Sequence, residues 1–311
     1  MAAVTAAMVK ELREVTGAGM MDCKKALAAT DGDMDKAVEF LREKGLAGAA
    51  KKAGRIAAEG IVVAKVSDDC KKAVVVEVNA ETDFVAKNEK FRTYAADVAA
   101  QALDSSAKSI EEFMEEKWNK DATMTVKEAL SSQISIIGEN MNIRRFEQID
   151  EANGFAASYI HAGGKIGVLV DVETDVVNDE IKDMAKNVAM QAAALKPLYT
   201  SRDEVDASYI EKEKEILTAA AKNEKPDAND KIISGMVMGR ISKELKEICL
   251  LDQVYVKAED GKQTVGNYVA AVAKANGANM KIKKFVRFET GEGLEKKNED
   301  FAAEVAKQMG Q

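Results

Sequence analysis

The feature that most limits the possible folds of this chain is an internal duplication. Residues 74–78 read Val-Val-Val-Glu-Val and resemble residues 168–172, Val-Leu-Val-Asp-Val, at an offset of 94. Residues 97–102 resemble residues 187–192 at an offset of 90, so the second copy lacks four residues of the first. In each copy a run of β-branched residues precedes a helical pattern. We therefore expect two related α+β units in one chain.

The four extra residues lie between the strand and the helix of the first copy, where residues 79–87 correspond to residues 173–177. Loops on a rigid scaffold commonly carry recognition residues, and an aromatic side chain beside an acid can contact another protein surface. The longer loop therefore holds a candidate partner-binding element, formed by Thr82, Asp83, Phe84 and Val85. Its position alone equally allows Phe84 to fold back into the core of its own unit.

Composition indicates a globular, helix-rich protein that does not bind nucleic acid directly. The chain has 311 residues, 46% of them hydrophobic, only 2 prolines, and a net charge of -8. That length allows two or three domains with cores, and the negative charge argues against affinity based on neutralising phosphates.

The cysteines and the apolar segments predict a cytoplasmic protein without a membrane partner. The three cysteines are far apart and show no Cys-x-x-Cys spacing, which is typical of reduced thiols. No apolar run approaches the ~20 residues of a membrane-spanning helix. The mildly apolar start lacks the preceding basic region of a signal peptide.

Residues 1–54 are predicted to form a three-helix docking module. Apolar residues recur at helical spacing from Val4 to Val15, a second helix is expected over residues 20–29, and a third from Met34 to just before Gly45. The basic segment Lys51–Arg55 is interpreted as an exposed linker to the next domain.

The first α+β unit is expected over residues 55–150. A hairpin over about residues 60–78 precedes a helix near residues 88–103, a helix from about Val126 and a strand over residues 141–149. The Lys/Glu-rich stretch between Ser105 and Thr123, which contains the only tryptophan, Trp118, is interpreted as a surface helix.

The second unit, residues 151–198 and 250–288, is expected to repeat this order. Its predicted elements are strands at residues 154–161, 166–172, 254–256 and 283–288, and helices at residues 179–194 and 265–274. Residues 199–249 carry two long helical patterns that indicate an inserted antiparallel coiled-coil hairpin. Residues 289–311 are assigned to a C-terminal module with a short helix at residues 300–308.

No combination of residues indicates catalysis, a metal site or a cofactor. The one histidine, His161, would have to serve every His-dependent site. The run from His161 to Lys165 lacks the order of a phosphate-binding Walker loop. An enzyme built on His161 and nearby carboxylates is the least favoured class. The sequence therefore favours a non-enzymatic protein that binds other proteins.

Six motifs closely resemble the bacterial translation elongation factor Ts family, in family order and at compatible spacing. They are Val9–Arg13, Thr16–Leu27, Thr82–Lys87, Ile137–Asn140, His161–Val170 and Phe285–Gly293. The resemblance implies an α+β fold with antiparallel sheets: an N-terminal ubiquitin-associated-like three-helix module, a duplicated α+β core, an inserted coiled-coil hairpin and a C-terminal helical module.

The resemblance also implies guanine nucleotide exchange on elongation factor Tu, a GTPase that binds in GDP-bound and nucleotide-free forms. The family's Asp-Phe pair enters the GTPase domain near the magnesium site, which assigns that role to Asp83 and Phe84. The corresponding partner contacts with the GTPase domain fall on Ile137, Gly138, Lys24 and Lys25, and the contact with another domain of Tu falls on His161. A homodimer or a 2:2 complex stays open, as does an adaptor that binds Tu without changing nucleotide release.

Overall fold

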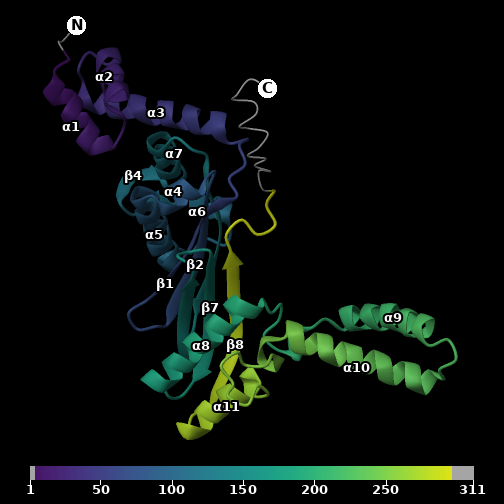
Figure 1. Ribbon diagram of the computed structural model, residues 1–311. Helices are drawn as coiled ribbons and strands as arrows, with labels where there is room; N and C mark the ends of the chain where they lie inside the picture. The colour runs from purple at the N-terminus through teal and green to yellow at the C-terminus, as the bar shows by residue number, and fades with distance from the viewer. Residues whose placement is uncertain (1–3, 296–311) are drawn as a thin grey trace.

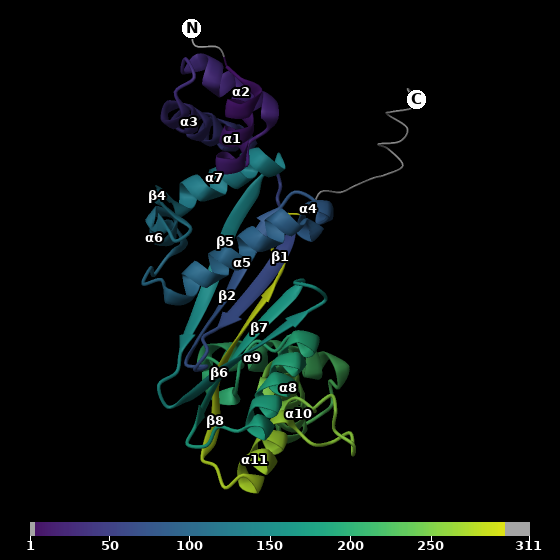
Figure 2. The same cartoon turned by 90° about the vertical axis from the view of Figure 1, so that its left-hand side faces the viewer.

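The computed structural model describes residues 4–295 and shows a helical module, two stacked α+β units and a projecting helical hairpin (Figure 1). The module lies at one end, the first unit in the middle and the second unit at the other end (Figure 2). Across this range no helix is both long and apolar enough to span a membrane. The helix expected at residues 300–308, and with it most of the C-terminal module, lies outside the described residues.

The N-terminal module consists of three helices around a small core that includes Leu12, Cys23 and Leu27. The helices are α1 (Ala6–Thr16), α2 (Met20–Ala29) and α3 (Met34–Lys52). Side chains of Thr5 and Asp33 cap α1 and α3, which accounts for where these helices begin. Gly17 ends α1 in the left-handed conformation that glycine readily adopts.

The expected end of the third helix before Gly45 was wrong, because α3 continues to Lys52. Gly45 is buried where α3 packs on α7 (Val126–Ile137). A Cβ atom at this position would lie 3.7 Å from the carbonyl oxygen of Ser131, an ordinary van der Waals contact, so Gly45 lies within the helix against α7 and does not end it. The expected linker is therefore partly helical, and the module is docked on the first unit.

A three-stranded antiparallel sheet forms the base of the first unit, in the order β1-β2-β5. Its strands are β1 (Glu59–Val66), β2 (Lys72–Ala80) and β5 (Met141–Asp150). Helices α5 (Glu89–Asp104) and α7 pack on one face of this sheet, around a core that contains Phe91, Val98 and Ile143. The expected order of elements in this unit is confirmed apart from the stretch after α5.

Residues 105–125 do not form the expected surface helix. They form a short helix and two short strands, α6 (Ile110–Glu115), β3 (Lys117–Trp118) and β4 (Asp121–Thr125). Trp118 is buried and packs against Tyr94, with 5.8 Å between the ring centroids. The many Lys and Glu residues belong to the outer face of this stretch. They gave no indication that the side chain of Trp118 holds the stretch on the core.

The second unit repeats the first in topology, with a three-stranded antiparallel sheet in the order β6-β7-β8. Its elements are β6 (Gly154–His161), β7 (Ile166–Thr174), α8 (Asp179–Leu195), α11 (Val265–Ala275) and β8 (Met280–Glu289). The strand expected at residues 254–256 was wrong, since Val254 makes only a single bridge, to Thr264. Residues 254–256 are instead held by hydrogen bonds of the Gln191 side chain and by a backbone hydrogen bond from Tyr255 to Gln263.

The structure confirms the duplication at the level of irregularities. The pairing register shifts between Glu77 and Val78 in the first sheet and between Asp171 and Val172 in the second, at the same offset as the repeated sequence, and the extra residues are Arg144 of β5 and Lys283 of β8. On the other side of each central strand, Gly60 pairs with Asn79 and Gly154 pairs with Glu173, and a Cβ at these glycines would come within 2.2 Å and 1.9 Å of carbonyl oxygens. Only glycine fits such an approach, so both copies need it at the same place.

The inserted segment forms an antiparallel helical pair that projects sideways from the second unit (Figure 1). It contains α9 (Ala207–Glu224) and α10 (Asp230–Ile248), flanked by the 3-10 turns Arg202–Glu204 and Leu250–Asp252. The two helices bury Ala221, Ile233, Val237 and Ile241 between them.

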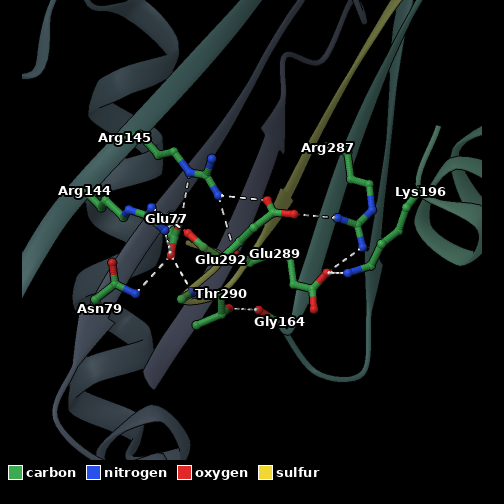
Figure 3. A network of polar contacts seen from close by, with 11 residues as sticks. Glu77, Asn79, Arg144, Arg145, Gly164, Lys196, Arg287, Glu289, Thr290 and Glu292 are labelled. Carbon is green, nitrogen blue, oxygen red and sulfur yellow. Dashed lines mark hydrogen bonds and ion pairs between the residues drawn. The ribbon is translucent and has the colours of Figure 1, made fainter. Parts of the chain in front are cut away.

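The two sheets pack face to face and are joined by polar contacts at the end of β8. Val62, Val75 and Leu169 lie in the apolar layer between the sheets. Figure 3 shows the buried carboxylate of Glu77 among Asn79, Arg144 and Arg145 of its own unit, with the chain after β8 beside it. The N–H of Gly291 donates to Glu77 at 2.7 Å. This network holds the two units in a fixed arrangement.

Candidate protein-interaction site

The longer loop of the first copy forms a short helix, α4 (Asp83–Lys87). The connection between β2 and α5 consists of residues 81–88, whereas in the second copy only residues 175–178 connect β7 to α8. Thr82 caps the helix, since its hydroxyl accepts a hydrogen bond from the N–H of Val85 at 3.3 Å. Asp83 and Lys87 form an ion pair of 2.7 Å one turn apart.

Phe84 points away from the molecule and is 80% exposed. The alternative that Phe84 folds into its own core is therefore wrong. Its neighbours fill that place, because Ala86 is buried and Val85 packs against the core of the first unit. An exposed phenylalanine on an ordered helix is available for burial against a partner.

The charge of Asp83 is fixed by its neighbour. A hydrogen bond from Lys87 lowers the pKa of the Asp83 carboxyl below its usual value, so this carboxylate is ionised at neutral pH. The tip of α4 therefore presents an apolar ring flanked by a paired acid and base.

The end of α7 lies beside the start of α4. Gly138 ends α7 in the left-handed conformation, with φ of 92°, and is exposed, whereas Ile137 is half-buried against the core. The two carboxylate oxygens of Glu139 accept hydrogen bonds from the N–H and the hydroxyl of Thr82, at 3.0 and 2.7 Å. The structure therefore brings together two of the expected segments, although they are more than fifty residues apart in sequence.

His161 lies at the end of β6 in the second unit, and it is exposed. Its Nδ1 atom is 3.1 Å from the hydroxyl of Tyr159, which orients the imidazole. Nη1 of Arg92 donates to the carbonyl oxygens of Gly163, in the turn after His161, at 3.1 Å and of Ala86, at the end of α4, at 3.4 Å. Arg92 thus links α4 to the turn that carries His161.

Lys24 and Lys25 lie on a different surface. Both are exposed on α2, and within residues 4–295 no hydrogen bond or ion pair connects them to α4 or to the turn after His161. Large apolar side chains of the same module are also exposed, among them Val15, Met20 and Met21, at 70%, 59% and 62%. The expected contact residues therefore form two separate surfaces, one on the core and one on the helical module.

Two residues that organise the core surface were not among the expected contact residues. Glu139 lies in a motif that the sequence singles out, but its partner Thr82 is distant in sequence. Nothing in the sequence marked Arg92 as a residue of this site, apart from its position on an exposed face of a helix. In the part of the chain that the structure describes, no three His, Cys, Asp or Glu side chains gather as metal ligands.

Comparison with known proteins gives one consistent family. The family described as Elongation factor TS matches residues 81–292. The chain is 54% identical over 309 residues to Elongation factor Ts of Clostridium novyi (strain NT), which covers 99% of each chain. It is 53% identical over 309 residues to Elongation factor Ts of Clostridioides difficile (strain 630), covering 99% of this chain and 100% of the relative.

Proposed function

This chain belongs to the elongation factor Ts family, a family of elongation factors in protein biosynthesis, and we propose that it accelerates release of GDP from elongation factor Tu in the cytoplasm. It acts by binding Tu in its GDP-bound and nucleotide-free forms, and it catalyses no chemical reaction itself. The observation that carries this proposal is the exposed ring of Phe84 on the tethered helix α4.

The proposed mechanism follows from how a GTPase holds its nucleotide. Backbone donors of the phosphate-binding loop and a magnesium ion supply most of that hold. The ring of Phe84, inserted beside the magnesium site with Asp83 at its edge, displaces the side chains that support the ion. Binding of the factor and binding of nucleotide then weaken one another by the same factor, because coupling between two sites is reciprocal.

The geometry around α4 supports contact over a wider area. Gly138 presents bare backbone next to α4, and the His161 turn is linked to it by Arg92. A bulky side chain at Gly138 would hold the two proteins apart, whereas His161 can offer a hydrogen bond to a second domain of Tu. Such an arrangement positions Phe84 by several contacts at once.

The helical module supplies the second part of the proposed interface. Lys24 and Lys25 lie on the same module as the exposed Met20 and Met21, a combination of apolar and basic groups that fits a partner surface of mixed character. The docking of the module on α7 through α3 supports a proposal in which both surfaces contact Tu as parts of one body. Linking two contact areas in this way increases affinity without requiring either to be strong.

The experiment that tests the proposal measures release of fluorescent GDP from preloaded Tu after addition of this protein. An exchange factor accelerates release in proportion to its concentration until the rate saturates. An adaptor binds Tu and leaves the release rate at its intrinsic value. Saturable binding without acceleration would therefore replace exchange with the adaptor function.

A further inference from the structure

Helix α4 is too short to fix its own orientation. It has five residues, and isolated helices below about 12 residues are marginal in water. Only Val85 and Ala86 pack against the core, and Phe84, 80% exposed, contributes no such anchor. The direction of the Phe84 ring must therefore depend on what holds the two ends of α4.

The first end of α4 is held by Glu139. Its two carboxylate oxygens accept hydrogen bonds from the backbone N–H and the hydroxyl of Thr82, at 3.0 and 2.7 Å. The Thr82 hydroxyl in turn accepts from the N–H of Val85, the residue that follows Phe84. A continuous chain of hydrogen bonds thus runs from Glu139 to the backbone next to Phe84, and the charged acceptor strengthens it.

The other end of α4 is held independently. Nη1 of Arg92 donates to the carbonyl oxygen of Ala86 and to that of Gly163 in the second unit. Loss of Glu139 would therefore free Thr82 and the first turn of α4, while the chain stays attached on both sides, through Glu81, which accepts from the N–H of Asn140 at 2.6 Å, and through Ala86. Thr82 is partly exposed, so its freed donors can bond to water and the core of the unit stays intact.

We propose that Glu139 is a positioning residue for nucleotide exchange: through Thr82 it fixes the orientation of Phe84. This inference rests on the proposed function. A rotation of α4 that moves the ring by about 1 Å would remove most of its effect on the nucleotide site, since misplacement of that size can lower a rate about a hundredfold. The exposed apolar surface available for binding would stay the same.

The test compares Glu139→Ala, Glu139→Gln and the matched control Glu112→Ala in the full chain. Glu112 also accepts a backbone hydrogen bond, from the N–H of Lys108 at 2.7 Å, but lies at α6. For each protein we would measure the Kd for GDP-bound Tu, the Kd for nucleotide-free Tu and the maximal rate of stimulated GDP release.

For Glu139→Ala we expect a Kd for GDP-bound Tu within about twofold of the original. The Kd for nucleotide-free Tu should rise about tenfold and the maximal release rate should fall by a similar factor, because the coupling between the two sites is what is lost. Glu139→Gln should lie between, since its side chain offers one acceptor oxygen in place of two. Glu112→Ala should match the original protein in all three measurements.

Hydrogen exchange on the free protein keeps this inference separate from the proposed function. The amide of Val85 should exchange faster in Glu139→Ala while amides of β2 keep their protection. Faster hydrogen exchange at Val85 in a protein that never stimulates GDP release would show that Glu139 tethers α4. It would also show that this tether has no role in nucleotide exchange. Unchanged hydrogen exchange at Val85 would overturn the positioning role even if the original protein is a nucleotide exchange factor. Equal increases in the Kd for GDP-bound Tu and the Kd for nucleotide-free Tu would do the same.

Discussion

Gln101 and Gln191 hold equivalent segments of the two units by the same pair of hydrogen bonds. Each side-chain amide donates to one backbone carbonyl and accepts from the N–H two residues later. The donated and accepted bonds go to Lys117 and Asn119 in the first unit, at 2.9 Å each, and to Val254 and Val256 in the second, at 3.0 and 2.9 Å. The duplication therefore extends into segments whose sequences no longer resemble one another.

This relationship predicts a large stability loss for Gln101→Met and for Gln191→Met. Methionine fills a similar volume but leaves a partly buried N–H and a partly buried carbonyl without their side-chain partner, which costs about 1 to 3 kcal/mol of unfolding free energy in each case. Urea denaturation measures the loss. Gln133→Met, at a partly exposed position on α7, is the control and should change stability by less than about 0.5 kcal/mol. Equal losses of unfolding free energy at all three positions would show that the paired hydrogen bonds do not account for the effect.

Glu77 carries a second prediction, because it is fully buried and bonded by four groups. Burial raises the pKa of its carboxyl, but hydrogen bonds from Gly291, Asn79 and Arg145 outweigh burial and hold the pKa below its usual value. The stability that Glu77 contributes is therefore present above pH 4.5 and lost as the pH falls through the lowered pKa. Glu77→Leu should cost about 3 to 5 kcal/mol at pH 7.

Urea denaturation of the original protein and of Glu77→Leu at pH 7 and at pH 3 tests that sign. The difference between the two proteins should shrink at the lower pH, because protonation of Glu77 in the unfolded chain removes the advantage that the lowered pKa gives to the folded chain. A difference that stays constant with pH would mean that the side chain acts through packing alone.

Asp171 occupies the position equivalent to Glu77, but its pKa is raised and not lowered. Burial and a hydrogen bond with Glu151 raise the pKa of Asp171 to about 6. Between about pH 4 and 6 the folded chain binds a proton that the unfolded chain has lost, so this group's contribution to stability decreases as the pH rises. Asp171→Asn removes the buried charge and should raise the unfolding free energy by about 1 to 2 kcal/mol at pH 7.5.

The gain from Asp171→Asn should be absent at pH 4, where the native carboxyl is already protonated. Thermal or urea denaturation at the two pH values gives the comparison. Destabilisation by the amide at both values would show that the ionised carboxylate has a favourable partner and that its raised pKa is not a stability cost.

Local signals made much of the fold predictable. Strands of β-branched residues and caps such as Asn88 and Asn178 act within a few residues, so most expected elements of the two units are confirmed. The segment around Trp118 failed because a tertiary contact with Tyr94 decides its fold. The helix end predicted at Gly45 was wrong for a similar reason, because the residue on α7 that Gly45 contacts is distant in the sequence.

The candidate site was predictable as a set of motifs but not as an arrangement. The residues from Thr82 to Val85 stood out through the length difference between the two copies. Their partner Glu139 could not be assigned from spacing, because hydrogen bonds across 57 positions follow from packing of whole elements. The exposure of Phe84 likewise depends on Val85 and Ala86 filling the core beneath it.

Removal of residues 1–54 tests how far the helical module stands alone. The remaining core keeps both sheets, so it should unfold in one cooperative transition, but the face of α7 that α3 covers becomes exposed and the urea midpoint should fall. Binding to Tu should weaken because Lys24, Lys25 and the apolar residues near them are lost. A truncated protein without a cooperative transition would show that the module is part of the core, and unchanged Tu affinity would exclude it from the interface.

Phe84→Ala separates a binding role of the ring from a role in folding. Because the ring is 80% exposed, its removal should leave the melting temperature almost unchanged, whereas loss of a core phenylalanine costs about 3 to 5 kcal/mol. An aromatic anchor at an interface is worth at least about 2 kcal/mol, so the complex with nucleotide-free Tu should weaken about thirtyfold. Asp83→Ala should act in the same direction but less strongly, since that carboxylate is already paired with Lys87.

Melting and stimulated GDP release should be measured on the same preparation of each variant. Val177→Ala is a suitable control, because Val177 is 48% exposed in the shorter loop of the second copy, which lacks the four extra residues. It should leave both quantities unchanged. A stable Phe84→Ala protein that stimulates release as fast as the original would exclude the ring as the exchange element, and a large drop in melting temperature with normal release would place it in the core. The exposed position of Phe84 on α4 predicts unchanged stability, and the proposed function predicts loss of stimulated release.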